Sequence, residues 1–210
     1  ADNAAMAIAL LVGGVGGGLW LTENGGTSWT VVRDMMPRVA ISCLVPDPAD
    51  NSIIYACTGE GFFNGDAIRG DGVWKITGAS GAPATWTIAQ VPGTAAAAGT
   101  QWRYVNRLVV LPQAADPNNV NNRMIAAATN NGIYRSVNGG TSFALVRTGR
   151  HLDLRYHPLD WNNLVAGNDA GGVSYSTDGG ATWNAVATVG LPIGGAGRVE
   201  VHPVSIASPG

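Results

Sequence analysis

The sequence has few charges and a single lysine, Lys75, and these shortages exclude several classes of protein. Charged residues make up 12% of the 210 residues, and the net charge is −2. This balance gives no electrostatic basis for binding nucleic acid or an anionic membrane surface. A hydrophobic content of 46% also argues against disorder, which needs low hydrophobicity and high net charge. We therefore expect a folded chain that does not bind nucleic acid.

Long helices are also missing from the pattern. The 30 glycines and 11 prolines, together with β-branched clusters, interrupt every window that could form a long amphipathic helix. Residues 4–20 are apolar enough to pass for a signal-peptide core, but they lack a basic leader, and the glycines between 13 and 18 would break a spanning helix. We expect short strands and tight turns, with no membrane insertion.

A repeated turn is the strongest signal in the sequence. Residues 22–29, 136–143 and 176–183 share a Ser or Thr, an Asn or Asp, two glycines and a closing aromatic residue, and residues 76–86 carry a stretched copy. Around each turn the same frame repeats: an apolar run ending in Pro, a polar turn, a second apolar run and a Gly-rich loop. Such spacing indicates a repeat architecture. Each unit reads as four short antiparallel strands, A to D, which is the blade of a propeller.

The sequence thus predicts an all-β protein, a β-propeller of four-stranded antiparallel blades, with about four blades in this chain. Residues 1–210 are expected to be a single propeller domain or a propeller fragment. The final strand could complete the first blade, which lacks strand A, and close a four-bladed ring. Alternatively, the open edges pair with further blades or with another chain. The blades are expected at residues 7–33, 38–90, 105–147 and 151–188, with a final strand at 198–203.

The residues of the repeated turn have mechanical roles. An Asn or Asp side chain can accept hydrogen bonds from backbone N–H groups of its own turn, and the glycines after it tolerate positive φ. The aromatic residues that open strand D bury a large apolar area. The expected structural set is Asn24, Trp29, Trp86, Asn138, Phe143, Asp178 and Trp183.

The turn resembles the Asp-box, S-x-D-x-G-x-T-W, of the bacterial neuraminidase-repeat propellers. Residues 176–183 match it fully and the other copies match it loosely, while residues 55–61 and 70–75 look like secreted bacterial members. The resemblance implies a sialidase-like propeller located outside the cell, in the periplasm or at the cell surface. It leaves function open, because the same turn recurs in sialidases, xyloglucan hydrolases, sortilin-type receptors and photosystem assembly factors.

The loops at the blade ends opposite the repeated turns are the expected ligand face. The longest, residues 59–71, contains three carboxylates, an arginine and two phenylalanines. Such a loop can be structural, can contact a sugar or a protein, or can supply the two carboxylates of a glycosidase. The candidate ligand-binding residues are Phe62, Phe63, Asn64, Arg69, Asp71 and Asn168.

Three carboxylates are the candidate catalytic residues: Asp169, Asp66 and Glu60. Residues 168–172 are similar to the T-D-x-G-G loop that carries a catalytic Asp in xyloglucan hydrolases. In this comparison Asp169 is the only residue that matches a catalytic residue of that family. The arginine cluster of sialidases is not evident, because Asp153 stands where Arg107 and Arg198 open strand A in other units. The expected function is a glycan- or protein-binding or assembly module, with a glycoside hydrolase as the alternative.

No metal or cofactor site is predicted, since neither the three histidines nor the acidic loop has a recognised ligand spacing. Cys43 and Cys57 fall on strands A and B of one hairpin, and pairing through a turn near Asp50 places them roughly opposite. They predict either a cross-strand disulfide in an oxidising compartment or two buried thiols.

Overall fold

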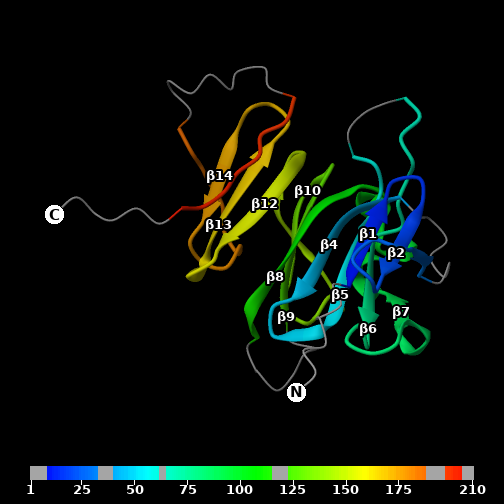
Figure 1. Cartoon of the computed structure of the whole chain (residues 1–210). Helices are drawn as coiled ribbons and strands as arrows, with labels where there is room; N and C mark the ends of the chain where they lie inside the picture. Colours follow the sequence, from blue (N-terminus) through cyan, green and yellow to red (C-terminus); the bar gives the residue numbers. More distant parts are fainter. Residues whose placement is uncertain (1–8, 33–39, 62–64, 115–122, 188–196, 205–210) are drawn as a thin grey trace.

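The computed structural model describes residues 9–32, 40–61, 65–114, 123–187 and 197–204 (Figure 1). Their strands form one three-stranded and three four-stranded antiparallel sheets, each running in chain order from one edge to the other. In the described residues the only helices are four short 3-10 segments. The fold is all-β and its sheets are the blades of a β-propeller, as the repeat predicts.

The first sheet has three strands because a strand A is absent from the described part of that unit. It comprises β1 (Leu10–Gly14), β2 (Gly18–Thr22) and β3 (Thr30–Val31). The second comprises β4 (Ile41–Asp47), β5 (Asp50–Thr58), β6 (Val73–Thr77) and β7 (Thr87–Gln90). The third comprises β8 (Val105–Ala114), β9 (Arg123–Thr129), β10 (Gly132–Ser136) and β11 (Ala144–Thr148). The fourth comprises β12 (His151–His157), β13 (Asp160–Asn168), β14 (Val173–Ser176) and β15 (Asn184–Ala185).

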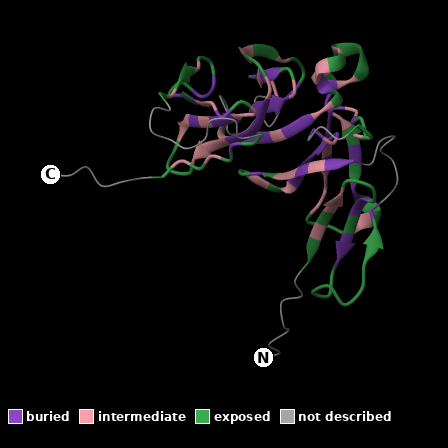
Figure 2. Cartoon of the chain, turned by 90° about the horizontal axis from the view of Figure 1, so that it is seen from above, coloured by how far each residue is buried: buried purple, intermediate pink, exposed green. Residues whose placement is uncertain are grey.

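The hydrophobic core lies between successive sheets, with the buried residues concentrated in the strands (Figure 2). Strands β4, β8 and β12 contact one another in series, and β1 contacts β4. One cluster joins the first two sheets through Leu19 and Ile76, a second joins the next two through Tyr55 and Leu108, and a third includes Leu154. Burying each large apolar side chain stabilises the fold by about 1.5–3 kcal/mol.

Each full copy of the repeated turn closes through its own Asn or Asp side chain. Oδ1 accepts the backbone N–H four residues later, at 2.9 Å for Asn24, 3.0 Å for Asn138 and 2.9 Å for Asp178. The Ser or Thr two residues before donates its hydroxyl to the same Oδ1. That hydroxyl oxygen also accepts the N–H of the second glycine, which has a positive φ in every copy. The predicted mechanical role is confirmed for these three side chains.

The closing aromatic residues differ in burial. Trp86, in the stretched copy, is 7% exposed and donates its indole N–H to the Gly81 carbonyl, whereas Trp29 is 40% exposed. Phe143 and Trp183 are half-buried and pack against the clusters between sheets. Trp29 is the most exposed of the four rings, because the first sheet has a packing partner on one side only among the described residues.

Residues 198–203 do not form the expected strand. They carry no strand assignment, and in the described structure β1 pairs only with β2, so the pairing that would close a four-bladed ring is absent there. The segment instead packs beside the fourth sheet, where Val201 donates its N–H to Asp153 Oδ2 at 3.0 Å (Figure 1).

Cys43 and Cys57 form a disulfide across the β4–β5 hairpin. They are directly paired in the strand register, with Cα atoms 5.0 Å apart, inside the range of about 4.4–6.8 Å that a disulfide spans. Both residues belong to the core cluster between the second and third sheets. Of the two alternatives from the sequence, the structure contains the disulfide.

A buried ion pair joins the second and third sheets. Arg123 Nε, at the start of β9, lies 3.0 Å from Asp47 Oδ2, at the end of β4, and the two side chains are 2% and 0% exposed. The other oxygen of Asp47 accepts the N–H of Ala49 and fixes the β4–β5 turn. Desolvating both charges is costly, so the pair supports the fold only while both partners are present.

Asp47→Asn should therefore lower the free energy of unfolding by about 3–5 kcal/mol, because it leaves the Arg123 guanidinium buried without a counter-charge. Glu200→Gln is the matched control, since the Arg198–Glu200 pair is exposed and should contribute at most about 1 kcal/mol. Urea denaturation of the three proteins measures both values. Equal, small losses would contradict the role given to Asp47.

The acid stability should depend on Asp178. Burial raises its pKa, but hydrogen bonds from Thr182 and Ser176 outweigh this and lower the pKa from 3.8 to about 2. A lowered folded-state pKa stabilises the fold above the unfolded value, and this contribution is lost as the pH falls through the folded value. Asp178→Asn, which copies Asn138, should thus be less stable than wild type at pH 6, with the difference vanishing near pH 2. Thermal unfolding across that range measures this, and a difference that does not change with pH would contradict it.

Candidate functional site

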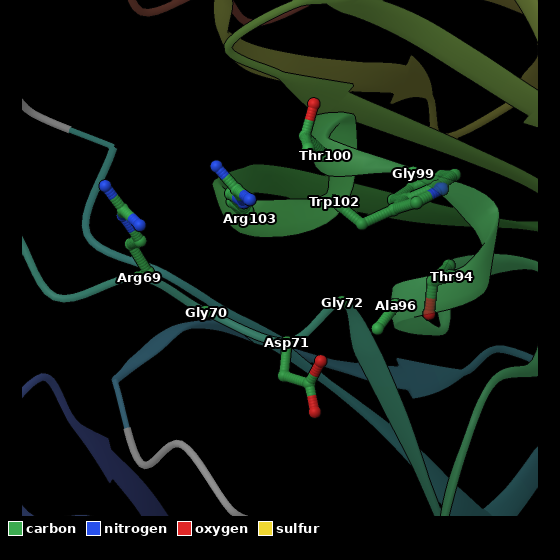
Figure 3. A pocket seen from close by; sticks show the side chains of 10 residues that line it. All are labelled: Arg69, Gly70, Asp71, Gly72, Thr94, Ala96, Gly99, Thr100, Trp102 and Arg103. Carbon is green, nitrogen blue, oxygen red and sulfur yellow. The ribbon is translucent and has the colours of Figure 1, made fainter.

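A pocket of about 210 Å³ opens between the second and third sheets (Figure 3). One wall is the end of the β5–β6 loop and the other is the chain that connects β7 to β8. That connection contains η2 (Pro92–Thr94), η3 (Ala96–Ala98) and η4 (Thr100–Arg103). Both walls belong to the loops that the sequence assigns to the ligand face. The lining residues are Arg69, Gly70, Asp71, Gly72, Thr94, Ala96, Gly99, Thr100, Trp102 and Arg103.

Backbone hydrogen bonds tie the two walls together. Gly70 donates its N–H to the Arg103 carbonyl at 2.8 Å, and Gly72 donates to the Trp102 carbonyl at 3.0 Å. The Thr58 hydroxyl spans the base of the loop, donating to the Gly72 carbonyl at 2.6 Å and accepting the N–H of Asp71 at 2.7 Å. The loop therefore holds its end fixed through main-chain groups, which leaves its side chains available for other contacts.

The floor of the pocket is held by two buried side chains. The Thr94 hydroxyl accepts the Val73 N–H at 2.9 Å and donates to the Val91 carbonyl at 2.9 Å. Trp102 is 2% exposed, and its ring centroid lies 5.2 Å from that of Tyr134 and 4.8 Å from that of Phe143. The Trp102 ring thus packs in the core and exposes little of its surface to the pocket.

Three charged side chains at the pocket have no partner within the described structure. Arg69 and Arg103 are exposed and Asp71 is half-buried, and none of them makes a side-chain hydrogen bond or ion pair there. Figure 3 shows Arg69 and Arg103 extending on the same side of the loop, with the Asp71 carboxylate pointing the other way. A charged partner can therefore reach two cations and one anion without displacing an existing contact.

The other predicted site residues are not brought into this pocket. Asn168 Oδ1 accepts the N–H groups of Ala170 and Gly172, so its side chain closes the β13–β14 loop. Asp169, which follows β13, has its Oδ2 2.7 Å from Nη1 of Arg150, which precedes β12. Glu60 Oε2 accepts the Ile68 N–H at 3.3 Å, within the β5–β6 loop.

The remaining sequence candidates divide in two. Asp66 is exposed in the turn at residues 65–66, away from the pocket lining. Phe62, Phe63 and Asn64 lie outside the described residues. In the described ranges no group of three or more His, Cys, Asp or Glu side chains could hold a metal ion. The helices there are also too short to cross a membrane.

Sequence reasoning missed half of the pocket. The candidates chosen from the sequence include no residue of the β7–β8 connection, whereas Thr94, Thr100, Trp102 and Arg103 line the pocket. The available signal was a long, Pro- and Gly-containing connection with an arginine near its end. Its 3-10 turns fold it back onto the β5–β6 loop, and their close approach requires Gly72, whose φ is +78°.

Comparisons with solved structures show the same fold. A family-74 glycoside hydrolase xyloglucanase from Xanthomonas campestris aligns with 90% of this chain at 16% identity and a TM-score of 0.58. Sqt1 from Saccharomyces cerevisiae aligns with 85% at 11% identity and a TM-score of 0.55. YCF48 bound to D1 peptide aligns with 86% at 18% identity and a TM-score of 0.51.

The chain is similar to these proteins over only part of their length. It spans 29% of the xyloglucanase, 47% of Sqt1 and 50% of YCF48. No protein-family profile and no curated protein sequence matches the chain. At these identities the likeness defines the class of protein by its fold alone: the chain is a β-propeller.

Gly72→Ala should disturb the pocket directly. A Cβ at this position would lie 2.4 Å from the Thr94 carbonyl oxygen, and the residue has a φ of +78°. The strain should lower the free energy of unfolding by about 1–3 kcal/mol. Gly16→Ala is the control, since a Cβ there meets nothing within 4 Å. Urea denaturation compares them, and equal stabilities would show that the close approach is not required.

Proposed function

We propose that this propeller is a protein-binding module that holds a charged segment of a partner in the pocket between the second and third sheets. The observation that carries the proposal is the set of unpaired charges, Arg69, Arg103 and Asp71, around a pocket whose walls are fixed by backbone hydrogen bonds. Because these walls are already ordered, binding there requires little further loss of conformational entropy.

Peptide side chains suit this pocket better than a neutral sugar. Arginine guanidinium groups bind carboxylates bidentately, and Asp71 can accept from a lysine or arginine of the partner. The one aromatic residue of the lining, Trp102, is buried and cannot stack on a sugar ring. Among the described residues the lining also holds one carboxylate, whereas glycoside hydrolysis uses two. YCF48, which has this fold, has been observed with a bound peptide.

We also propose that the repeated turn is an Asp-box and that the protein works in an extracellular, periplasmic or cell-surface setting. The turn's hydrogen bonds, from the Ser or Thr hydroxyl to the Asn or Asp Oδ1 and from the following N–H groups, support the first point. The Cys43–Cys57 disulfide supports the second, because disulfides persist in oxidising compartments.

Charge reversal at the pocket tests the proposed function. The chain is immobilised and exposed to surface and secreted extracts of the source cells, with Arg69→Glu/Arg103→Glu as the variant and Arg198→Glu as the control. The double variant should capture at least about tenfold less partner than wild type, corresponding to the loss of about 1.4 kcal/mol. Arg198 lies outside the pocket lining, so its reversal should leave capture unchanged.

Pretreatment of the extract identifies the class of partner. Protease digestion should abolish the arginine-dependent capture, and periodate oxidation of glycans should leave it intact. Capture that survives protease and is lost after periodate would assign the site to glycans. Equal capture by wild type and the double variant would contradict the proposed role of the pocket in binding the partner.

A further inference from the structure

A second cavity, of about 370 Å³, lies on the axial side of the blades, away from the pocket between the sheets. The innermost strands β4, β8 and β12 supply its walls, and Figure 1 shows these strands side by side. His202, in the segment beside the fourth sheet, closes one side. The other lining residues are Leu44, Val45, Pro46, Arg107, Leu108, Val109, Leu154, Arg155, Tyr156 and Pro158.

A buried carboxylate positions the two arginines of this cavity. Asp153 is completely buried, and its Oδ1 lies 3.0 Å from Arg107 Nε and 3.2 Å from Arg155 Nε. The other oxygen accepts the N–H of Val201 at 3.0 Å. Arg107 comes from β8 and Arg155 from β12, so a single carboxylate fixes cations from two sheets.

Both arginines keep their terminal NH2 groups for another partner. Each contacts Asp153 through Nε, and in the described structure neither side chain makes any other hydrogen bond or ion pair. Their side chains are 23% and 40% exposed. An oxyanion placed between them could accept hydrogen bonds from both guanidinium groups.

The charge of the site matches one carboxylate. The side chains of Arg107, Arg155 and Asp153 together carry a net charge of +1. A carboxylate would bring the site to neutrality, whereas a doubly charged phosphate would leave an uncompensated negative charge in a partly desolvated cavity. Apolar wall residues, including Leu44, Val45 and Tyr156, suit an alkyl side chain adjoining that carboxylate.

We propose that the axial cavity binds a peptide carboxylate next to an apolar side chain, with Arg107 and Arg155 as its ligands. The inference rests on the proposed role in binding protein segments and assigns to it a second contact, separate from Arg69 and Arg103. The C-terminal carboxylate of a peptide and the side chain of Asp or Glu offer the same group, and the choice of peptide distinguishes them.

The test is fluorescence polarisation with N-terminally labelled peptides and the whole chain. The first peptide, Gly-Gly-Ser-Ala-Leu, has a free C-terminal carboxylate; the second is its amide; the third is amidated Gly-Ser-Glu-Leu-Ala. Arg107→Gln and Arg155→Gln are measured separately, because Asp153 then keeps one arginine and the buried charge stays paired. Arg69→Gln is the control from the other pocket.

We expect the free acid to bind at least about tenfold more tightly than its amide. Arg107→Gln and Arg155→Gln should each weaken binding of the free acid about tenfold, whereas Arg69→Gln should leave it unchanged. Comparable binding of the Glu peptide would show that the site accepts side-chain carboxylates as well as chain ends, and its failure would assign the site to chain ends. Equal binding of acid and amide, no binding of any peptide, or equal competition by free glucuronate would overturn the proposal. The proposed function is tested separately by capture that depends on Arg69 and Arg103. If that capture is observed although the peptides fail to bind the axial cavity, only the further inference is overturned.

Discussion

The fully buried carboxylate of Asp153 joins segments that lie far apart in the sequence. It accepts from Arg107 in the third sheet, Arg155 in its own sheet and the backbone of Val201 beyond it. A buried carboxylate needs such partners, because the desolvation of its charge would otherwise destabilise the fold by several kcal/mol. The placement of the fourth sheet against the third, and of residues 197–204 against the fourth, therefore depends on this group.

The same logic applies between the second and third sheets, where Asp47 and Arg123 are paired and buried. Apolar packing between blades is strong but has little directionality, whereas an ion pair is satisfied in only one relative position of two sheets. The second and third sheets, and the third and fourth, thus meet through both a hydrophobic cluster and a charged contact. These contacts also leave Arg107 and Arg155 positioned at the axial cavity, so assembly of the blades and the proposed recognition use the same side chains.

The local pattern of the sequence predicted the blades well. The hydrogen bonds of a turn such as residues 176–183 can be predicted from the sequence, because their donors and acceptors lie within four residues of each other. The β4–β5 register was equally readable, and it pairs Cys43 with Cys57. The strand expected at 198–203 was not found, because a strand needs a neighbour, and β1 is not placed beside that segment.

The site was less predictable because its contacts are between distant segments. Asp71 and Arg69 were identified from a loop rich in charge, but nothing in the sequence places Arg103 across from them. Asn168 looked like a ligand-binding residue, whereas its side chain is used by its own loop. Asp153 and Arg107 were compared as equivalent positions in two units, yet pairing between them could be recognised only once the sheets were stacked.

A double-mutant cycle between Arg107 and Asp153 tests most directly whether buried charges fix the blades. Urea unfolding of the wild type, Arg107→Gln, Asp153→Asn and the double variant yields the coupling energy. We expect a coupling of about 1–3 kcal/mol, because the two groups are in contact in a buried network. A coupling below about 0.5 kcal/mol, as found for independent sites, would show that this pair does not fix the fourth sheet against the third.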